Sequence, residues 1–441
     1  MQILIVAAGI AALLLLILRF KLPAFVVLLI VSAGVGLALG MDTNAVIKSI
    51  TNGMASTLGF IAVVVGLGSM FGALLEFSGG VRAIADNLLK RASETQASWA
   101  LGSAGLLIGV PVFFDVAIII LAPLIHQLCL RTGRSPVYHA APLLAGLLVG
   151  HAFIPPTPGP LAVAELIDAD LGWVIGMGLM CGIPAMIVAG PLLARRFQNI
   201  AVGRNIALSE NTALVNESST MTLKQALFAI VLPLALIVGN TAGQQLLPEG
   251  ALRTTLAFVG HPFIALLLSC LYVYIVFGTM QRVPADKLLN VMNRALEPAG
   301  MVVLVTGAGG VFKQILVDSG VGDLLGAFFS QQAIPPMLLA FVLAALIRIA
   351  QGSATVAMIT SAGLVSPILQ HLDLDQLHTA LVVIAIASGA SIASHVNDSG
   401  FWLVSRCLNL TEAETLRSWT VLSTVAAITG FATASLLAVL L

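Results

Sequence analysis

The amino-acid sequence predicts an all-α polytopic membrane protein that consists of two inverted repeats. Of its 441 residues, 59% are hydrophobic and only 9% are charged. The mean hydropathy of +1.05 excludes a water-soluble domain. Apolar runs long enough to cross a bilayer recur along the chain, and one glycine-rich pattern occurs in each half. Because the net charge is zero, we expect no nucleic-acid partner.

Ten apolar runs have roughly the 20 residues that a membrane-spanning helix needs. They begin near Ile3, Leu22, Thr57, Tyr138, Gly172, Leu223, Leu256, Pro298, Thr379 and Trp419. Two further runs, 98–128 and 336–369, each suit one long crossing or two half-helices that fold back as a re-entrant hairpin.

The distribution of lysine and arginine favours the hairpins. With both runs as hairpins, the cytoplasmic segments collect most basic residues, and the outer side keeps only Lys48 and Arg253. The positive-inside rule supports this arrangement. Each repeat then has about five transmembrane helices plus one re-entrant hairpin, and both termini face the outer, periplasmic side of the cell inner membrane.

A short pattern indicates the internal repeat. Gly-Leu-Gly-Ser-Met-Phe at 66–71 matches Gly-Ala-Gly-Gly-Val-Phe at 307–312. Five crossings is an odd number, so the second half enters the membrane upside down. Inverted repeats with broken helices in corresponding places are typical of alternating-access transporters. We expect a first repeat at 1–196, a polar cytoplasmic linker at 197–222 and a second repeat at 223–441.

Two polar interruptions of apolar runs mark the expected site. One reads Ser-His-Val-Asn-Asp-Ser-Gly at 394–400, and the other is the proline-rich segment 150–159. Polar side chains at bilayer depth are costly unless they face a cavity or a partner, and proline breaks a helix. The hairpin tips, near Asp115 and at 348–355, should meet these breaks. Four half-helix N-termini would then suit a carboxylate.

Three segments carry a resemblance to a known family: Gly-Ala-Gly-Gly-Val-Phe-Lys-Gln-Ile-Leu-Val-Asp-Ser-Gly at 307–320, Arg-Ile-Ala-Gln-Gly-Ser-Ala-Thr-Val-Ala at 348–357 and Ser-His-Val-Asn-Asp-Ser-Gly-Phe-Trp-Leu at 394–403. They resemble the gluconate permease family of proton-coupled symporters, and the similarity covers essentially the whole chain. The resemblance implies two hairpins, scaffold and transport domains, a homodimer and a sugar acid as substrate. The retained His-Val-Asn-Asp favours gluconate over D-serine. Thr157 stands where many members have histidine, so a titratable group is missing there.

Seven residues are candidates for substrate binding, and some of them could instead have a structural role. The substrate-binding candidates are Asp115, Thr157, Arg348, Ser353, Thr355, Asn397 and Asp398. Arg348 suits the substrate carboxylate better than Lys313, which lies near the outer boundary. Ser353, Thr355 and Asn397 suit hydroxyl groups, or they only cap half-helices.

The proton-coupling candidates are two acids and two histidines: Asp115, Asp398, His151 and His395. An acid at a cavity can exchange protons near neutral pH, or it can simply pair with a neighbour to hold a hairpin. Each histidine could equally donate to a backbone carbonyl as part of helix packing.

The leading function is import of gluconate or a related sugar acid with protons, by alternating access of the elevator type. A transporter of D-serine, or of another small hydroxy acid or amino acid, is the alternative within the family. An intramembrane aspartyl hydrolase using Asp115 and Asp398 is an alternative of another class. No cofactor or metal site is expected, since the four cysteines lack metal-site spacing and no nucleotide-binding loop occurs.

Overall fold

The computed structural model of the protein describes residues 1–90, 96–201, 221–280, 283–321, 324, 335–370, 372 and 374–441. Within these ranges every regular element is a helix. Most of the expected linker at 197–222 lies outside the described residues, which include only 197–201 and 221–222 of it.

The helices of the first half include two pairs joined by short turns, α5 with α6 and α7 with α8. The bounds are α1 Gln2–Leu18, α2 Ala24–Ala38, α3 Thr43–Phe77, α4 Gly80–Lys90, α5 Ala97–Gly109, α6 Phe114–Thr132, α7 Pro136–Phe153, α8 Pro158–Leu166, α9 Leu171–Ile187, η1 Val188–Leu192 and η2 Arg195–Phe197.

The second half has corresponding pairs, α16 with α17 and α18 with α19. The bounds are α10 Leu223–Leu246, α11 Ala251–Val259, α12 Pro262–Ile275, η4 Val276–Met280, α13 Ala285–Arg294, α14 Leu296–Asp318, α16 Pro336–Gln351, α17 Ala354–Leu369, α18 Gln376–Ser391, α19 Ser399–Cys407, α20 Glu412–Thr415, η5 Leu416–Thr420 and α21 Val421–Leu440.

Fewer helices than the ten expected spans reach membrane-crossing length. Among the described residues, seven helices are long and apolar enough, or eight if the bent pair α11 and α12 is one span. The difference arises because α1, α2 and α18 have only 17, 15 and 16 residues. In contrast α6, expected as half a hairpin, has 19 residues and qualifies, whereas its partner α5 has 13.

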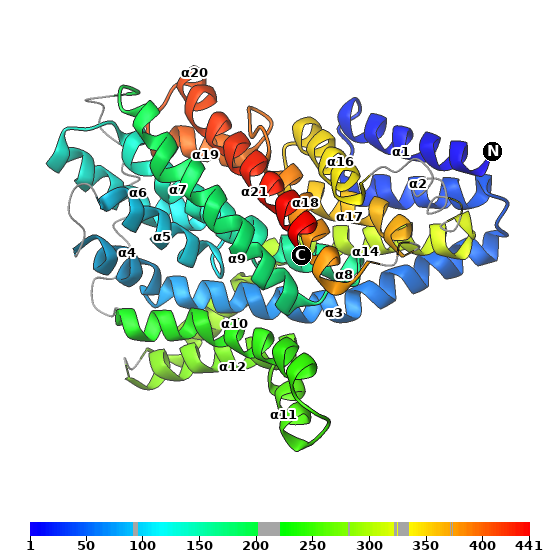
Figure 1. The fold of residues 1–441 in the computed structure, drawn as a ribbon, viewed down its shortest axis with the longest axis horizontal. Helices are drawn as coiled ribbons and strands as arrows, with labels where there is room; N and C mark the ends of the chain where they lie inside the picture. The colour runs from blue at the N-terminus through cyan, green and yellow to red at the C-terminus, as the bar shows by residue number, and fades with distance from the viewer. Residues whose placement is uncertain are drawn as a thin grey trace.

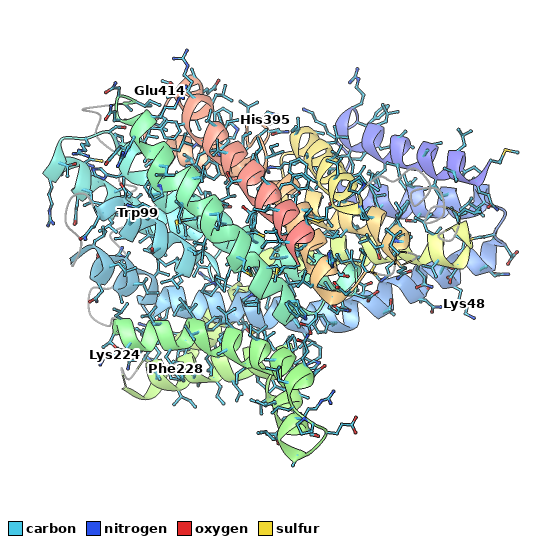
Figure 2. The ribbon with its side chains drawn as sticks, viewed as in Figure 1. Lys48, Trp99, Lys224, Phe228, His395 and Glu414 are labelled. Carbon is cyan, nitrogen blue, oxygen red and sulfur yellow. The ribbon has the colours of Figure 1, made fainter. Side chains whose placement is uncertain are left out.

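The longest helix, α3, organises the architecture. Its 35 residues extend about 52 Å at 1.5 Å per residue, which exceeds the roughly 30 Å of a bilayer core and requires a tilt or a protrusion. In Figure 1 it runs along the long axis; α12 packs on it, and α10 packs on α12. Lys48 and Lys224, expected on opposite sides of the membrane, lie toward opposite ends of that axis (Figure 2).

Helices in corresponding positions of the two halves pack on corresponding partners. α5 packs on α7 as α16 packs on α18, and α7 packs on α9 as α18 packs on α21. The halves also interlock, because α2 packs on α14 while α12 packs on α3. The α5–α6 pair and the α16–α17 pair lie in opposite halves of the view in Figure 1.

Glycines allow the hairpin arms to approach their partner helices closely. A Cβ at Gly146 of α7 would lie 2.2 Å from the carbonyl oxygen of Gly102 on α5. A Cβ at Gly389 of α18 would lie 2.2 Å from the carbonyl oxygen of Phe341 on α16. Small residues at helix contacts are the usual means of packing within a membrane.

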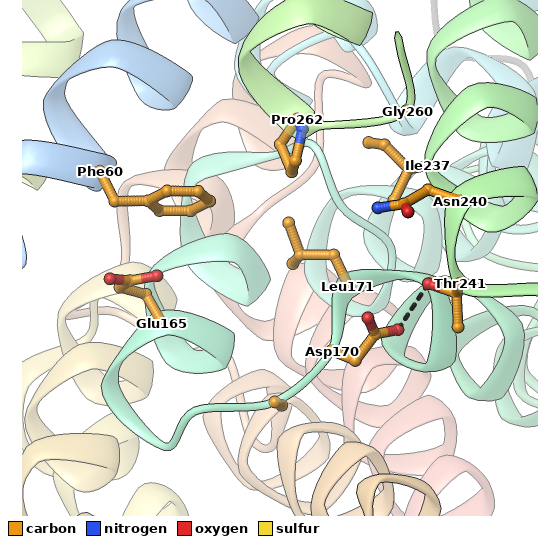
Figure 3. Close-up of a pocket in the computed structure, with 11 residues that line it drawn as sticks. Phe60, Glu165, Asp170, Leu171, Ile237, Asn240, Thr241, Gly260 and Pro262 are labelled. Atoms are coloured by element: carbon orange, nitrogen blue, oxygen red, sulfur yellow. Dashed lines mark hydrogen bonds between the residues drawn. The ribbon is translucent and has the colours of Figure 1, made fainter. Parts of the chain in front are cut away.

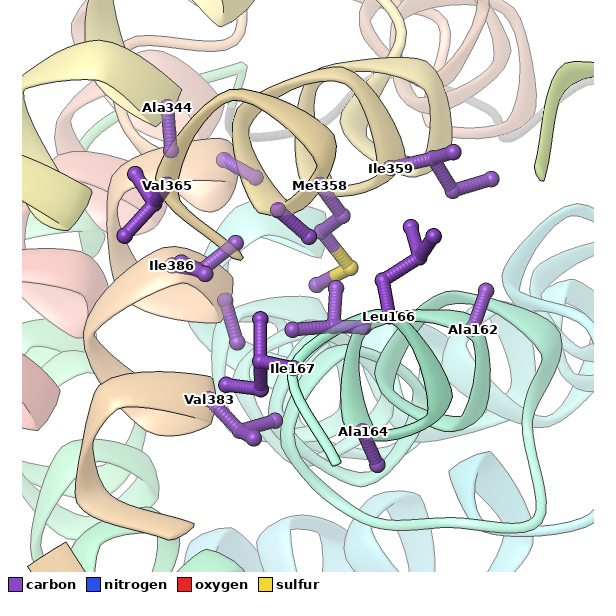
Figure 4. Close-up of a cluster of buried hydrophobic side chains, with 14 of the residues drawn as sticks. Ala162, Ala164, Leu166, Ile167, Ala344, Met358, Ile359, Val365, Val383 and Ile386 are labelled. Carbon is purple, nitrogen blue, oxygen red and sulfur yellow. The ribbon is translucent and has the colours of Figure 1, made fainter. Parts of the chain in front are cut away.

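The apolar core joins the two halves at α8, α17 and α18. Leu166 and Ala162 of α8 pack with Met358 and Ile359 of α17, all at most 2% exposed, and Ile386 of α18 lies in the same cluster (Figure 4). The first helical break is thereby fixed against the second half of the chain.

Candidate substrate-binding site

Asp398 is the centre of a buried polar network at the second interruption. It is the N-cap of α19, and its Oδ1 accepts a hydrogen bond from the Gly400 N–H at 3.1 Å. Its other oxygen accepts from a guanidinium nitrogen of Arg348 and from the Ser394 hydroxyl. Arg348 is 4% exposed and Asp398 8%. Because a buried charge is costly without a partner, this pair holds the end of α16 against the start of α19.

Two of the three guanidinium nitrogens of Arg348 donate hydrogen bonds within the protein, while its buried Nε has no partner among the described residues. A second guanidinium nitrogen donates to the Gly352 carbonyl, at the residue that ends α16 in the left-handed conformation, with φ of 88°. The sequence suggested that Arg348 binds the substrate carboxylate. In the structure its charge is neutralised by Asp398, so a carboxylate would have to compete with that residue.

The tip between α16 and α17 packs against the interruption at 394–400 through contacts with backbone carbonyls. The Asn397 side chain is exposed, and its Nδ2 donates to the Ile349 carbonyl at 2.8 Å. A Cβ at Gly352 would lie 2.1 Å from the Asn397 carbonyl oxygen, so only glycine fits there. Ser353 is the N-cap of α17 and Thr355 is half-buried in its first turn. Ser353 therefore has the capping role that the sequence left open.

A chain of contacts links this network to the start of α6. The Ser394 hydroxyl accepts from Trp419 Nε1 at 2.6 Å, and the Trp419 ring packs on Phe114 with centroids 5.1 Å apart. The next residue, Asp115, is exposed and lies in the first turn of α6, a helix that packs on α19. The two candidate acids therefore belong to one region.

The first interruption is neutral. Thr157, 4% exposed, donates to the carbonyls of His151 at 2.8 Å and of Ile154 at 2.9 Å. Its hydroxyl hydrogen thus binds the backbone at the end of α7, where α8 begins after the proline-rich turn. The His151 ring lies 5.8 Å from that of Phe113 at the α5–α6 tip.

A small cavity of about 10 Å³ lies beside the first interruption. Its lining comes from α3, the α5–α6 tip and the break between α7 and α8: Gly68, Ser69, Pro111, Phe113, His151, Pro156, Thr157 and Pro158. The sequence analysis missed Ser69. The available signal was the repeat itself, in which Ser69 stands where the second half has Gly310.

His395 has a local structural partner. Its Nδ1 lies 2.8 Å from the carbonyl oxygen of Ala393, a residue with φ of 48°, and the ring is half-buried. This contact matches the packing alternative for His395. The equivalent atom of His151 is buried and has no hydrogen-bond partner among the described residues.

The starts of four helices are neighbours around this region. α6 packs on α19, and α8 packs on α17, where a Cβ at Gly159 would lie 2.6 Å from the Met358 sulfur. The Arg348–Asp398 pair joins the α16–α17 tip to α19, and the small cavity joins the α5–α6 tip to α8. The positive ends of helix dipoles are favourable for an anion.

Lys313 lies outside this site. Its Nζ donates to the Leu166 carbonyl at 3.0 Å and to Asp168 at 3.1 Å, at the C-terminal end of α8. This contact closes the α8–α9 turn onto α14.

A second cavity, of about 160 Å³, lies at that same end of α8 (Figure 3). Glu165 and Asp170 line it, and Asp170 accepts a hydrogen bond from Thr241 at 2.7 Å. Among the described residues, no group of three or more metal-binding side chains occurs.

Comparison with known proteins identifies the family. The profile described as GntP family permease matches residues 1–440. The low-affinity gluconate transporter of Escherichia coli K12 is 41% identical over 97% of this chain and 96% of its own length. The L-idonate transporter of the Gnt-II system in the same organism is 38% identical over 98% of this chain and 97% of its own length.

A solved structure has a related fold. The YdaH transporter of Alcanivorax borkumensis aligns with a TM-score of 0.63 and 17% identity, over 94% of this chain and 96% of its own. At that identity the similarity concerns the fold alone. The whole-length profile match and the close relatives show that the chain, a multi-pass membrane permease and not an enzyme, belongs to the GntP permease family.

Proposed function

We propose that the protein is a secondary active symporter that imports gluconate or a closely related sugar acid together with protons. Curated relatives are described as gluconate transporters or permeases, and one as an L-idonate transporter. The observation that supports the proposal is the buried Arg348–Asp398 pair at the start of α19, together with the packing of α6 on α19 and of α8 on α17, an arrangement that suits a polyhydroxylated carboxylate.

Proton coupling is assigned to the acids of this site. Asp115 is an exposed residue in the first turn of α6, which packs on α19, whereas Asp398 is held by Arg348 and Ser394. Binding of a substrate carboxylate near Arg348 would weaken the hold of Arg348 on Asp398. A proton taken up by either acid would then compensate the added negative charge.

Alternating access of the elevator type is part of the proposal. The corresponding packing of α5 on α7 and of α16 on α18 supports two inverted repeats, at 1–196 and 223–441. A location in the cell inner membrane with both termini outside follows the distribution of basic residues. The homodimer implied by the family resemblance stays a prediction.

Transport into proteoliposomes tests the function. We expect labelled gluconate to accumulate when a proton gradient is imposed, and an uncoupler to abolish accumulation. Competition by unlabelled gluconate, L-idonate, D-serine and short hydroxy acids ranks the substrates. Accumulation that follows a sodium gradient at fixed pH and zero potential would contradict proton coupling. Strongest competition by D-serine would contradict the sugar-acid assignment.

Asparagine variants of the two acids separate coupling from binding. Asp115→Asn and Asp398→Asn keep nearly the same volume and a carbonyl acceptor but cannot exchange a proton. We expect the variant of the coupling acid to keep gluconate counterflow, measured per folded protein, and to lose accumulation. Full proton-driven accumulation in both variants would exclude both acids and leave His151 and His395.

A further inference from the structure

Two buried polar atoms near the first interruption have no hydrogen-bond partner among the described residues. They are the hydroxyl oxygen of Ser69, a residue 2% exposed on α3, and Nδ1 of His151 near the end of α7. Both residues line the same cavity. Buried polar groups are nearly always hydrogen-bonded, and leaving one unpaired costs about 1–3 kcal/mol.

The dimensions of the cavity limit what can bind there. Its volume of about 10 Å³ is close to the minimum that holds one water molecule. The lining has no acid, lysine or arginine, and it includes three prolines and Phe113. A carboxylate or a cation would be left without a charged partner there, whereas a neutral hydroxyl group has the size of water and both donates and accepts.

We propose that Ser69 and His151 form a subsite that receives one hydroxyl group of the transported acid. The inference rests on the proposed function and deepens it by naming two residues that select polyhydroxylated substrates. The Thr157 hydroxyl is already bonded to two carbonyls, so Ser69 and His151 supply the open positions. The substrate carboxylate then lies toward the charged second interruption.

The test compares the parent and Ser69→Ala by competition against labelled gluconate uptake. The competitors are gluconate and the series of analogues that each lack one hydroxyl group. In the parent, removing the contacted hydroxyl should weaken competition on the order of 3- to 10-fold, the equivalent of one hydrogen bond. In Ser69→Ala, competition by gluconate itself should weaken by a similar factor. The analogue that lacks the contacted hydroxyl should compete as strongly in Ser69→Ala as it does in the parent.

Ser388→Ala is the matched control. Ser388 is also fully buried with an unpartnered hydroxyl among the described residues, but it lies on α18 and does not line the cavity. We expect the parental pattern for every analogue in this variant. A pattern in Ser388→Ala like that of Ser69→Ala would show a general packing effect and overturn the subsite.

His151 provides an independent arm. We expect His151→Ala to reproduce the selective loss and His151→Asn, which keeps a polar group near Nδ1, to restore part of it. If every analogue lost the same competition strength in Ser69→Ala, with none of them spared, the subsite would be overturned. Gluconate uptake by the parent would still support the proposed function. Absence of gluconate uptake in the parent would instead contradict the proposed function, and the subsite with it.

Discussion

The two helical interruptions occupy corresponding positions in the halves of the chain but differ in chemistry. The break between α18 and α19 contains a buried ion pair, Arg348–Asp398, and its side-chain hydrogen bonds extend through Ser394 to Trp419. The break between α7 and α8 is neutral, and Thr157 holds it by bonds to backbone carbonyls alone.

The difference agrees with the division of roles that we propose for the two breaks. The second break contains the Arg348–Asp398 ion pair, with which a substrate carboxylate and a proton exchange partners in the function proposed above. The first half offers hydroxyl-sized space and neutral hydrogen-bonding groups. A sugar acid has a charged carboxylate at one end and neutral hydroxyl groups along the rest of its chain. The charged break and the neutral break therefore fit the two parts of the substrate proposed above.

The largest expected effect comes from removing one member of the ion pair. Arg348→Met leaves a buried carboxylate and Asp398→Asn a buried guanidinium, and each should lose about 3–5 kcal/mol of folding stability. The double variant has neither charge and should recover most of that loss without recovering gluconate uptake. Thermal unfolding of the purified protein and uptake measure the two outcomes separately. Equal stability of the double and single variants would contradict the pairing.

A glycine comparison tests how the α16–α17 tip docks. Gly352→Ala should cost at least about 2 kcal/mol, because alanine is disfavoured at φ of 88° and its Cβ would strike the Asn397 carbonyl. Gly133→Ala, at φ of 67° with nothing within 4 Å, should show only the conformational cost of about 1 kcal/mol. Similar melting temperatures for the two variants would count against close docking at the second break.

Thr157 tests the neutral break. Thr157→Val removes the hydroxyl at similar volume and should cost about 1 kcal/mol, since two backbone carbonyls lose their shared donor. Thr157→Ser retains the hydroxyl and serves as the control, with near-parental unfolding. If Thr157→Val changed gluconate affinity and left stability intact, the hydroxyl would act on substrate and not on the backbone.

The smallest effect is expected at Lys313. Its partner Asp168 has a side chain 70% exposed, so solvent screens the ion pair and Lys313→Met should cost less than about 1 kcal/mol. Uptake should stay near the parental rate, because this contact lies at the end of α8 away from the breaks. A loss of uptake as large as that of Arg348→Met would place a necessary cation outside the site as we define it.

The sequence by itself determined the class of protein and the positions of the breaks. High hydropathy with few charges requires helices whose backbone hydrogen bonds are internal. Proline at 155, 156 and 158 and the polar run at 394–400 end those helices through local chemistry. The family resemblance, based on contiguous motifs, was also available from the chain alone and is confirmed by the profile match.

The tertiary structure decided which groups meet. Nothing local says that Arg348 pairs with Asp398, that Trp419 donates to Ser394, or that Ser69 reaches the first break, because these contacts join helices far apart in the chain. In helices that are apolar all round, no hydrophobic face reveals the direction of a side chain. The number of membrane crossings had the same limitation. Hydropathy cannot distinguish the 13 residues of α5 followed by the 19 of α6 from one long span, because the turn between them is stabilised by packing on α3 and α7.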